Sequence, residues 1–217
     1  GIIDCYWGGS SITCWMSREQ LAKLESGKNY LENYAALVGE KSSQQYTKEM
    51  EEYNCAYQHC LKSTEEVKQK DPQASWKEIH KICGECPWPQ PVGWQSPFRP
   101  NGLHETMIRR IAPYSLRGFL YYQGEEDVQR YADYSDMMQM LVKQWRMDWN
   151  DWNLPFLFVQ LPMYLADGEK DDSCWALQRE QQYIASMMIQ NLADFMRIGL
   201  NFGGELIPIS KELAHVQ

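Results

Sequence analysis

Hydrophobic and polar residues along this chain form alternating blocks that predict helices and strands in turn. The stretch "LHETMIRRI" (103–111) has helical spacing, whereas "LRGFLYYQG" (116–124) contains the apolar run of a short strand. A long amphipathic helix follows, because four apolar residues recur at helical spacing: Tyr134, Met138, Leu141 and Trp145. The stretch "LPFLFVQLP" (154–162) is nearly all apolar, which is typical of a strand buried on both faces.

The same alternation continues toward the C-terminus. The stretch "SCWALQREQQYIASMM" (173–188) predicts a helix, and "DFMRIGL" (194–200) predicts a last strand. Strands separated by helices of this length pair in parallel and are covered by helices on both faces. The sequence therefore predicts an α/β fold, a three-layer parallel sheet of the flavodoxin-like type, with a helical insert.

The N-terminal half predicts one further strand and the insert. Gly1–Trp7 is an apolar run that leads into Gly8 and Gly9, whose missing Cβ atoms let other backbone or a ligand approach closely. From about Ser17 the pattern is helical and polar, and five prolines within 86–100 end it in a loop. The expected division is the first strand and its turn (1–16), the helical insert and its return loop (17–100), and the remainder of the α/β domain (101–217).

The composition narrows the class of protein. The 217 residues are 44% hydrophobic, which suits a packed core, and no apolar run approaches the roughly 20 residues that span a bilayer. A net charge of −8 disfavours nucleic acid and anionic membranes, because both attract basic surfaces. No signal peptide is visible. The chain begins at Gly1 without a Met and inside an apolar run, so we expect a piece of a longer protein.

Aromatic residues and cysteines leave alternatives open. The thirteen Tyr and nine Trp fit core packing, or a carbohydrate-facing cleft in which flat rings stack on sugars. The seven Cys lack the dense spacing of a small secreted domain, so we expect reduced thiols and a cytoplasmic location. A zinc site is the alternative for four of them: Cys55, Cys60, Cys83 and Cys86.

Polar residues at two predicted strand ends indicate chemistry. In open parallel sheets, ligands bind beyond the carboxyl ends of the strands, and here Gly8–Ser11 and Gln123–Glu125 occupy two such ends. A glycine N–H and a side-chain amide are the donors that an oxyanion hole uses to stabilise the tetrahedral intermediate of acyl transfer. Each motif taken singly is more simply a tight turn or the start of a polar loop.

Taken together and in order, five segments resemble the sialate O-acetylesterase branch of the SGNH hydrolases, which are carbohydrate acetylesterases. They are "GIIDCYWGGSSITCWMS", "RPNGLHETMI", "GFLYYQGEED", "LVKQWRMDWNDWNLPFLFVQLPMY" and "WALQREQQ". The resemblance covers both ends of the sheet domain and little of the helical insert. It implies hydrolysis of acetyl esters on sugars by a serine acyl-enzyme mechanism, with no cofactor or metal and with an acetylated carbohydrate as substrate.

The resemblance also implies roles for individual residues. Gly8 or Gly9 would donate a backbone N–H to the oxyanion, and Gln123 would donate its side-chain amide. Glu125 would hold that amide in place, and Arg179 would order the site from behind. Three further residues are expected to contact the substrate: Trp7, Tyr122 and His104.

The resemblance does not extend to the nucleophile and the base. Such esterases use a Ser-His-Asp triad, but the Gly-Gln-Ser-Asn type motif is absent, and "GGELIPIS" (203–210) lacks the Asp-x-x-His pair. Ser10 and His215 are weak substitutes. Three explanations for the missing residues stay open. The sequence is an interior piece of a longer gene, it is altered after about Asn191, or the protein is an inactive relative that binds acetylated sugars. The start at Gly1 favours the first.

The absent serine strand has a structural consequence. In the family that strand lies inside the sheet, so we expect an open or rearranged edge beside Gly1–Trp7. A non-catalytic carbohydrate-binding or scaffold protein is the rival hypothesis, and a zinc or partner module in the Cys-bearing insert is a third. The sequence is compatible with a homo-oligomer and does not identify the sugar, because specificity resides in loops and in the insert.

Overall fold

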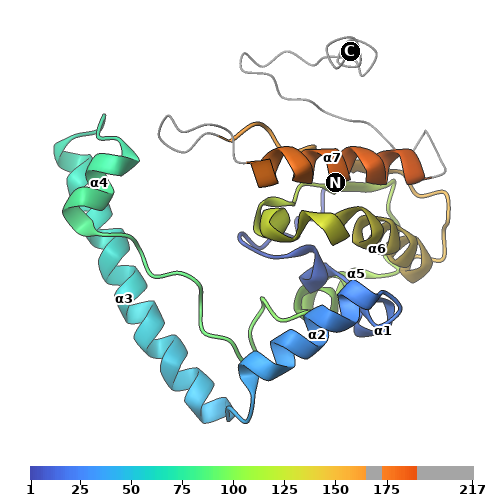
Figure 1. The fold of residues 1–217 in the computed structure, drawn as a ribbon, viewed down its shortest axis with the longest axis horizontal. Helices are drawn as coiled ribbons and strands as arrows, with labels where there is room; N and C mark the ends of the chain where they lie inside the picture. Colours follow the sequence, from blue (N-terminus) through green and yellow to red (C-terminus); the bar gives the residue numbers. More distant parts are fainter. Residues whose placement is uncertain (165–172, 190–217) are drawn as a thin grey trace. The chain divides into compact units, whose positions relative to one another are not determined.

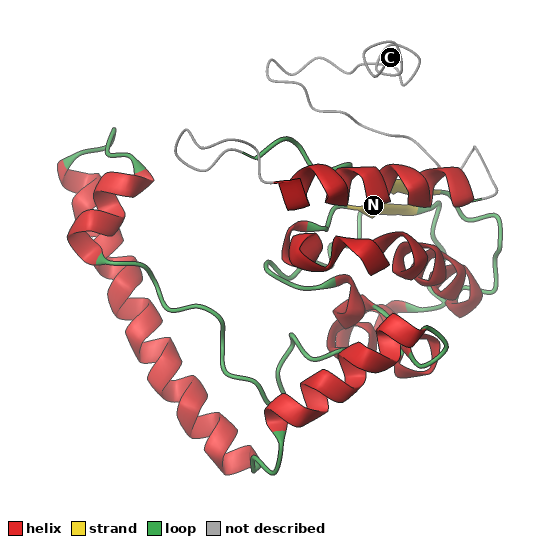
Figure 2. Cartoon of the chain, viewed as in Figure 1, coloured by secondary structure: helices red, strands yellow, loops and turns green. Residues whose placement is uncertain are grey.

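The computed structural model describes residues 1–164 and 173–189, which divide into two units. The first unit contains Gly1–Tyr34 and the described residues from Pro100 onward, and the second contains Ala35–Arg99. Helices predominate in both units, and the strands are short (Figure 2). No helix among the described residues combines the length and the apolar character needed to cross a membrane.

The first unit carries the strands and most of the short helices. η1 and η3 are 3-10 helices, and η2 is a π-helical turn. In chain order the elements are η1 (Ile12–Trp15), α1 (Arg18–Leu21), the start of α2 (Glu25–Val38), η2 (His104–Ile108), α5 (Arg109–Ile111), β1 (Phe119–Tyr121), η3 (Glu125–Asp133), α6 (Tyr134–Asp148), β2 (Phe156–Phe158) and α7 (Ser173–Met188).

β1 and β2 form a parallel pair, with Phe119 opposite Phe156 and Tyr121 opposite Phe158. Because α6 lies between them in the sequence, the connection is a β-α-β crossover. Gly118 permits the close pairing at the start of β1. Its φ is +155°, and a Cβ at this position would lie 2.7 Å from the carbonyl oxygen of Pro155.

Aromatic rings build the core between this sheet and α6. The ring centroid of Phe119 lies 5.3 Å from that of Trp145 and 5.0 Å from that of Trp149. Phe156 is fully buried, and its ring lies 5.7 Å from Trp145. Trp145 is held in place because its indole N–H donates to the carbonyl oxygen of Trp15 at 3.0 Å. Much of the aromatic content is therefore explained by core packing.

α7 packs beside α6. It packs against α6 and η3, and Figure 1 shows α6 and α7 lying next to each other. Its residues Gln178, Gln182 and Ala185 are buried. α6, α7 and η3, the segment that follows β1, therefore pack against one another.

The sequence predicted most of these elements. The helices within 103–111, 134–148 and 173–188 are confirmed, as are the two strands and their parallel pairing. The strand predicted at Gly1–Trp7 is wrong: these residues form no strand, and the side chain of Ile2 is 89% exposed. Because these residues form no strand in the described part of the chain, the open edge expected beside them stays a prediction.

The sheet of the described residues is small. It has two parallel strands. The described residues therefore form a parallel α/β core, and they do not contain the further strands of the predicted three-layer sheet. The last predicted strand, 194–200, lies outside the described residues.

The second unit is helical. α3 (Ser43–Lys70) begins with a capping box formed by Ser42 and Gln45, and α4 (Trp76–Cys83) begins with the predicted box of Ser75 and Glu78. The return segment packs against α3, since the hydroxyl of Tyr53 donates to the carbonyl oxygen of Pro87 at 2.9 Å.

A disulfide between Cys60 and Cys86 links α3 to the return segment. This bond corrects two predictions. Cys60 and Cys86 are not reduced thiols, and they are not available to a zinc ion. In residues 1–164 and 173–189, no group of three or more His, Cys, Asp or Glu side chains is placed to hold a metal ion. The zinc site, considered as an alternative at Cys55, Cys60, Cys83 and Cys86, is therefore wrong.

Phe156→Ala should lower the free energy of unfolding by about 3–5 kcal/mol, because it leaves a cavity among packed aromatic rings. Urea denaturation followed by tryptophan fluorescence measures this loss. Leu120→Ala is the matched control on the neighbouring strand, and the change there should stay below about 0.5 kcal/mol because the side chain is 78% exposed. Similar losses in both variants would contradict the assigned core.

Candidate active site

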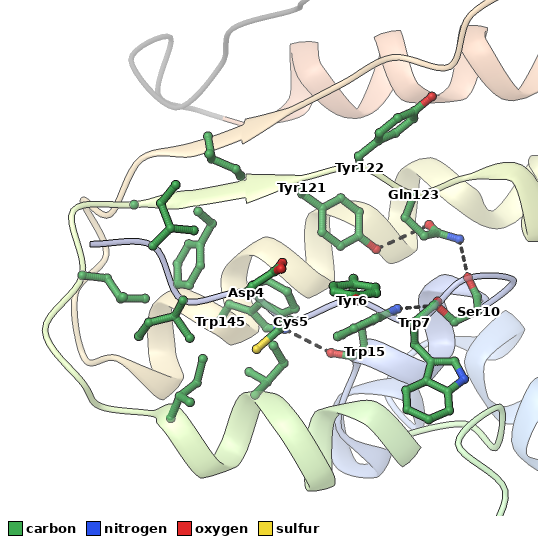
Figure 3. A pocket seen from close by; sticks show the side chains of 18 of the residues that line it. Asp4, Cys5, Tyr6, Trp7, Ser10, Trp15, Tyr121, Tyr122, Gln123 and Trp145 are labelled. Carbon is green, nitrogen blue, oxygen red and sulfur yellow. Dashed lines mark hydrogen bonds between the residues drawn. The ribbon is translucent and has the colours of Figure 1, made fainter.

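The turn after Gly1–Trp7 brings backbone groups to the C-terminal end of β1. Gly9 has a φ of +71°, a left-handed conformation that favours glycine. Gly8 and Gly9 are exposed, and within the described residues neither makes a hydrogen bond. The Ser10 hydroxyl donates to the carbonyl oxygen of Trp7 at 2.7 Å and accepts from the indole N–H of Trp15 at 2.9 Å (Figure 3).

Gln123 reaches this turn from the end of β1. Its Nε2 donates to the carbonyl oxygen of Ser10 at 3.0 Å and to Oδ2 of Asp127 at 2.6 Å. Figure 3 shows the amide directed at Ser10. The hydroxyl of Tyr134 lies 3.1 Å from the amide oxygen. Both amide hydrogens and the amide oxygen therefore have partners, and the side chain, which is 7% exposed, has a fixed orientation.

Asp127 holds the turn and the amide together. One carboxylate oxygen accepts from the Ser11 hydroxyl at 2.7 Å, and the other accepts from the backbone N–H of Ile12 at 2.7 Å as well as from Gln123. The side chain is 1% exposed. Burial raises the pKa of Asp127 above the ordinary value for aspartate, although the hydrogen bonds from Ser11, Ile12 and Gln123 act in the opposite direction.

α7 closes the site from behind. The side chain of Gln182 donates from Nε2 to the carbonyl oxygen of Gln123 at 3.1 Å and accepts at Oε1 from the N–H of Leu161 at 2.9 Å. Gly124 makes room for this contact, because a Cβ there would lie 2.9 Å from Nε2 of Gln182. Tyr134 on α6 adds its hydroxyl at 3.1 Å from the same carbonyl oxygen. Both helices therefore fix the backbone of Gln123.

A cavity of about 1130 Å³ opens beside these residues. Gly8, Gly9, Ser10 and Gln123 line it, so the structure brings the predicted oxyanion residues to one place. The aromatic side chains in its wall include Trp7 and Tyr122, which are 42% and 56% exposed. Their contacts with a substrate stay predictions. Both rings are accessible in the same cavity as the predicted oxyanion residues.

Glu125 does not hold the amide of Gln123. It is exposed at the start of η3, whereas Asp127, two residues on, turns into the protein and makes the contact. The sequence does not reveal this difference, because Glu125, Glu126 and Asp127 are consecutive carboxylates and only Asp127 is buried. Asp127, Ser11, Tyr134 and Gln182 were not predicted. The four-residue spacing from Gln123 to Asp127 was the available signal.

His104 does not line the cavity. It is 5% exposed on η2, and its Nε2 lies 2.9 Å from Oδ2 of Asp148 on α6. The predicted substrate contact is wrong for this residue, because its ring is used to join two helices. Arg179 lies on α7, where its carbonyl oxygen accepts from Gln160 at 2.7 Å, and its ordering role stays a prediction.

The described residues do not pair a serine with a histidine. The hydroxyl of Ser10 has Trp7 and Trp15 as partners, so no base activates it. His215, the other weak candidate, lies outside the described residues. The geometry can therefore orient an amide donor and a glycine turn at a cavity, and among the described residues no serine hydroxyl meets a histidine ring.

Comparison with known proteins identifies the family. The family model described as carbohydrate esterase, sialic acid-specific acetylesterase matches residues 91–201, which is just over half of the chain. The chain belongs to this family of carbohydrate esterases. The segment matched contains Gln123 and Asp127.

The chain is also similar to a solved structure. A carbohydrate acetylesterase from Xanthomonas citri is 29% identical over 52% of this chain and 27% of its own, with a TM-score of 0.41. The chain thus spans about a quarter of that protein's length. No curated protein matches.

Asp127→Ala should lower the free energy of unfolding by about 2–4 kcal/mol, because it leaves buried N–H groups of Ile12 and Gln123 without acceptors. Asp127→Asn should cost less, since its amide oxygen still accepts and its N–H₂ can donate to the Ser11 hydroxyl. Denaturant titration of the three proteins measures this order. The control is Asp136→Ala, at an exposed position of α6, where a loss below about 1 kcal/mol is expected. Equal losses at both positions would contradict the role of Asp127.

The stability contribution of Asp127 should depend on pH. Since its folded-state pKa is raised, the folded protein holds the proton more tightly than the unfolded chain does. The free energy of unfolding of the wild type should therefore rise relative to Asp127→Asn as the pH falls through the raised pKa toward about 4, the unfolded-state value. Denaturant titrations of both proteins across that pH range test this sign. A difference that stays constant, or that moves the other way, would show that the carboxyl is not buried as described.

Proposed function

We propose that this chain contributes the oxyanion-stabilising part of a carbohydrate O-acetylesterase, which hydrolyses acetyl esters on sugars by a serine acyl-enzyme mechanism. The observation that carries the proposal is the amide of Gln123, fixed by Asp127 and directed at the Gly8–Ser10 turn beside the cavity. Membership of the carbohydrate esterase family supports it. We also propose that the whole protein has the complete three-layer sheet, of which the described residues contain two strands.

The proposed chemistry depends on which of the two hydrogen bonds donated by the Gln123 amide can be given up in favour of the substrate. The contact with Asp127 is short and charge-assisted, whereas the contact with the Ser10 carbonyl is 3.0 Å long. In the proposed reaction, the developing oxyanion replaces the Ser10 carbonyl as the acceptor. Asp127 meanwhile keeps the second amide hydrogen and so prevents the amide from rotating. The N–H groups of Gly8 and Gly9, which no described residue engages, supply the second donor.

The substrate is an acetylated carbohydrate of the sialate or hemicellulose type. Trp7 and Tyr122 offer aromatic faces at the wall of the cavity, on which a sugar ring can stack. The expected cytoplasmic location stays a prediction, although a disulfide such as Cys60–Cys86 is more typical of oxidising compartments.

One observation favours a second candidate function. The amide hydrogens of Gln123 are both engaged, and among the described residues no serine hydroxyl is hydrogen-bonded to a histidine ring. A chain with these features binds acetylated sugars without cleaving them. Release of acetate separates the two functions, because only the esterase produces it.

In the complete, full-length protein, Gln123→Ala should reduce kcat for an acetylated sialate or acetylated xylan by roughly 10²–10³-fold, the usual effect of removing one oxyanion donor. Coupled detection of acetate measures the rate. Gln129→Ala is the matched control, since that side chain is exposed on η3, and it should keep the wild-type kcat. An unchanged kcat in the Gln123 variant would exclude the proposed donor. Wild-type protein that binds the sugar in an NMR titration and releases no acetate would support the second function.

A further inference from the structure

The guanidinium of Arg130 lies between the carboxylate that orients Gln123 and an aromatic ring of α2. Its Nη2 is 3.9 Å from Oδ1 of Asp127, and its central carbon, Cζ, is 4.8 Å from the centre of the Tyr30 ring. Nη2 also donates to the carbonyl oxygen of Glu126 at 3.3 Å. These contacts bring one positive charge next to the buried carboxylate.

The shape of η3 and the packing of α2 give the guanidinium a defined position. The backbone of η3 is kinked at Arg130, whose φ of −128° and ψ of 28° are not helical. The side chain is 47% exposed and reaches back to Asp127, three residues earlier. Tyr30 is partly buried and packs against the hydrophobic core. Since the face of an aromatic ring attracts a guanidinium, the fixed ring of Tyr30 restrains Arg130.

Arg130 is the only basic side chain within 4.0 Å of the Asp127 carboxylate in residues 1–164 and 173–189. Four other titratable groups face Asp127 from η1, α2, β1 and α6: Cys14, Tyr30, Tyr121 and Tyr134. Burial raises the pKa of each of them, that of Cys14 to about 12, so they are uncharged near neutral pH. Glu126, the preceding residue, adds a like charge. Arg130 therefore supplies the positive charge for a buried carboxylate that has an acidic neighbour.

We propose, on the basis of the function proposed for Gln123, that Arg130 is a positioning residue: its guanidinium stabilises the Asp127 carboxylate, which holds the amide. Tyr30 keeps that guanidinium in place. Burial raises the pKa of Asp127, and the hydrogen bonds to the carboxylate and the charge of Arg130 act in the opposite direction. An ionised carboxylate is the stronger acceptor for the Gln123 amide. Arg130 therefore extends the pH range over which the donor stays fixed at the turn.

Titration of Asp127 followed by carbon-13 NMR tests this role in the full-length protein. Labelled aspartate reports each carboxyl group, and the signal that disappears in Asp127→Asn identifies Asp127. In Arg130→Gln the midpoint of this titration should lie at a higher pH than in the wild type, because the stabilising charge is gone. Arg130→Lys keeps a positive charge and should return the midpoint toward the wild-type value. The matched control is Arg110→Gln, which removes a guanidinium exposed on α5 and should not move the midpoint.

Two variants of Tyr30 test the contribution of the ring. Tyr30→Phe keeps an aromatic face for the guanidinium and should retain the wild-type midpoint of Asp127. Tyr30→Leu removes that face, so the midpoint should move in the same direction as in Arg130→Gln, and by less. A midpoint in Tyr30→Leu that equals the wild-type value would overturn the role of Tyr30.

Kinetics of the same full-length proteins connect the carboxylate to the reaction. Arg130→Gln should lower kcat for an acetylated sugar by roughly tenfold and leave KM nearly unchanged, because a misplaced donor weakens the transition state more than substrate binding. An Asp127 midpoint that is the same in the wild type and in Arg130→Gln would overturn the positioning role. A shifted midpoint with an unchanged kcat would also overturn it, provided that Gln123→Ala lowers kcat. Wild-type kcat in Gln123→Ala would instead exclude the proposed function and leave the titration result standing, so the two failures are distinguishable.

Discussion

The buried carboxylate of Asp127 joins two parts of the first unit that lie far apart in the sequence. It accepts hydrogen bonds from Ser11 and Ile12, 116 and 115 residues away, and from Gln123 on its own segment. Burying a carboxylate costs free energy unless hydrogen bonds compensate. Burial raises the pKa of Asp127, while the hydrogen bonds from Ser11, Ile12 and Gln123 act in the opposite direction. The hydrogen bonds of this carboxylate fix the position of the turn after Gly1–Trp7 relative to the end of β1.

The other contacts of Gln123 depend on that position. With its amide fixed by Asp127, Gln123 meets the Ser10 carbonyl on one side, while Tyr134 on α6 and Gln182 on α7 hold its amide oxygen and its backbone on the other. An amide that is already oriented stabilises a developing charge without the cost of reorganisation. This property links the packing of the two helices to the chemistry proposed for the family, and it also explains why Gly124 must lack a Cβ.

Sequence reasoning found the parts of this arrangement that are local. Helical spacing predicted α6 and α7, the Ser75–Glu78 pair predicted the start of α4, and the glycine turn and Gln123 were recognised as one site. It assigned the amide's partner to Glu125, because a run of three carboxylates does not show which of them the 3-10 turn of η3 directs inward. It also predicted a strand at Gly1–Trp7 from apolar character alone, but a strand needs backbone partners. The Cys60–Cys86 disulfide depends on a Cα separation of 5.5 Å across two segments, which the spacing of cysteines does not reveal.

The most direct test of this account is NMR detection of scalar couplings across the hydrogen bonds of the Gln123 side chain. We expect couplings from Nε2 of Gln123 to the carbonyl carbon of Ser10 and to the carboxyl carbon of Asp127, the latter the stronger because that contact is shorter. An Nε2 group without either coupling, whose two protons exchange with each other rapidly by rotation, would show that the amide is free. The central claim, that Asp127 fixes the donor at the turn, would then be wrong.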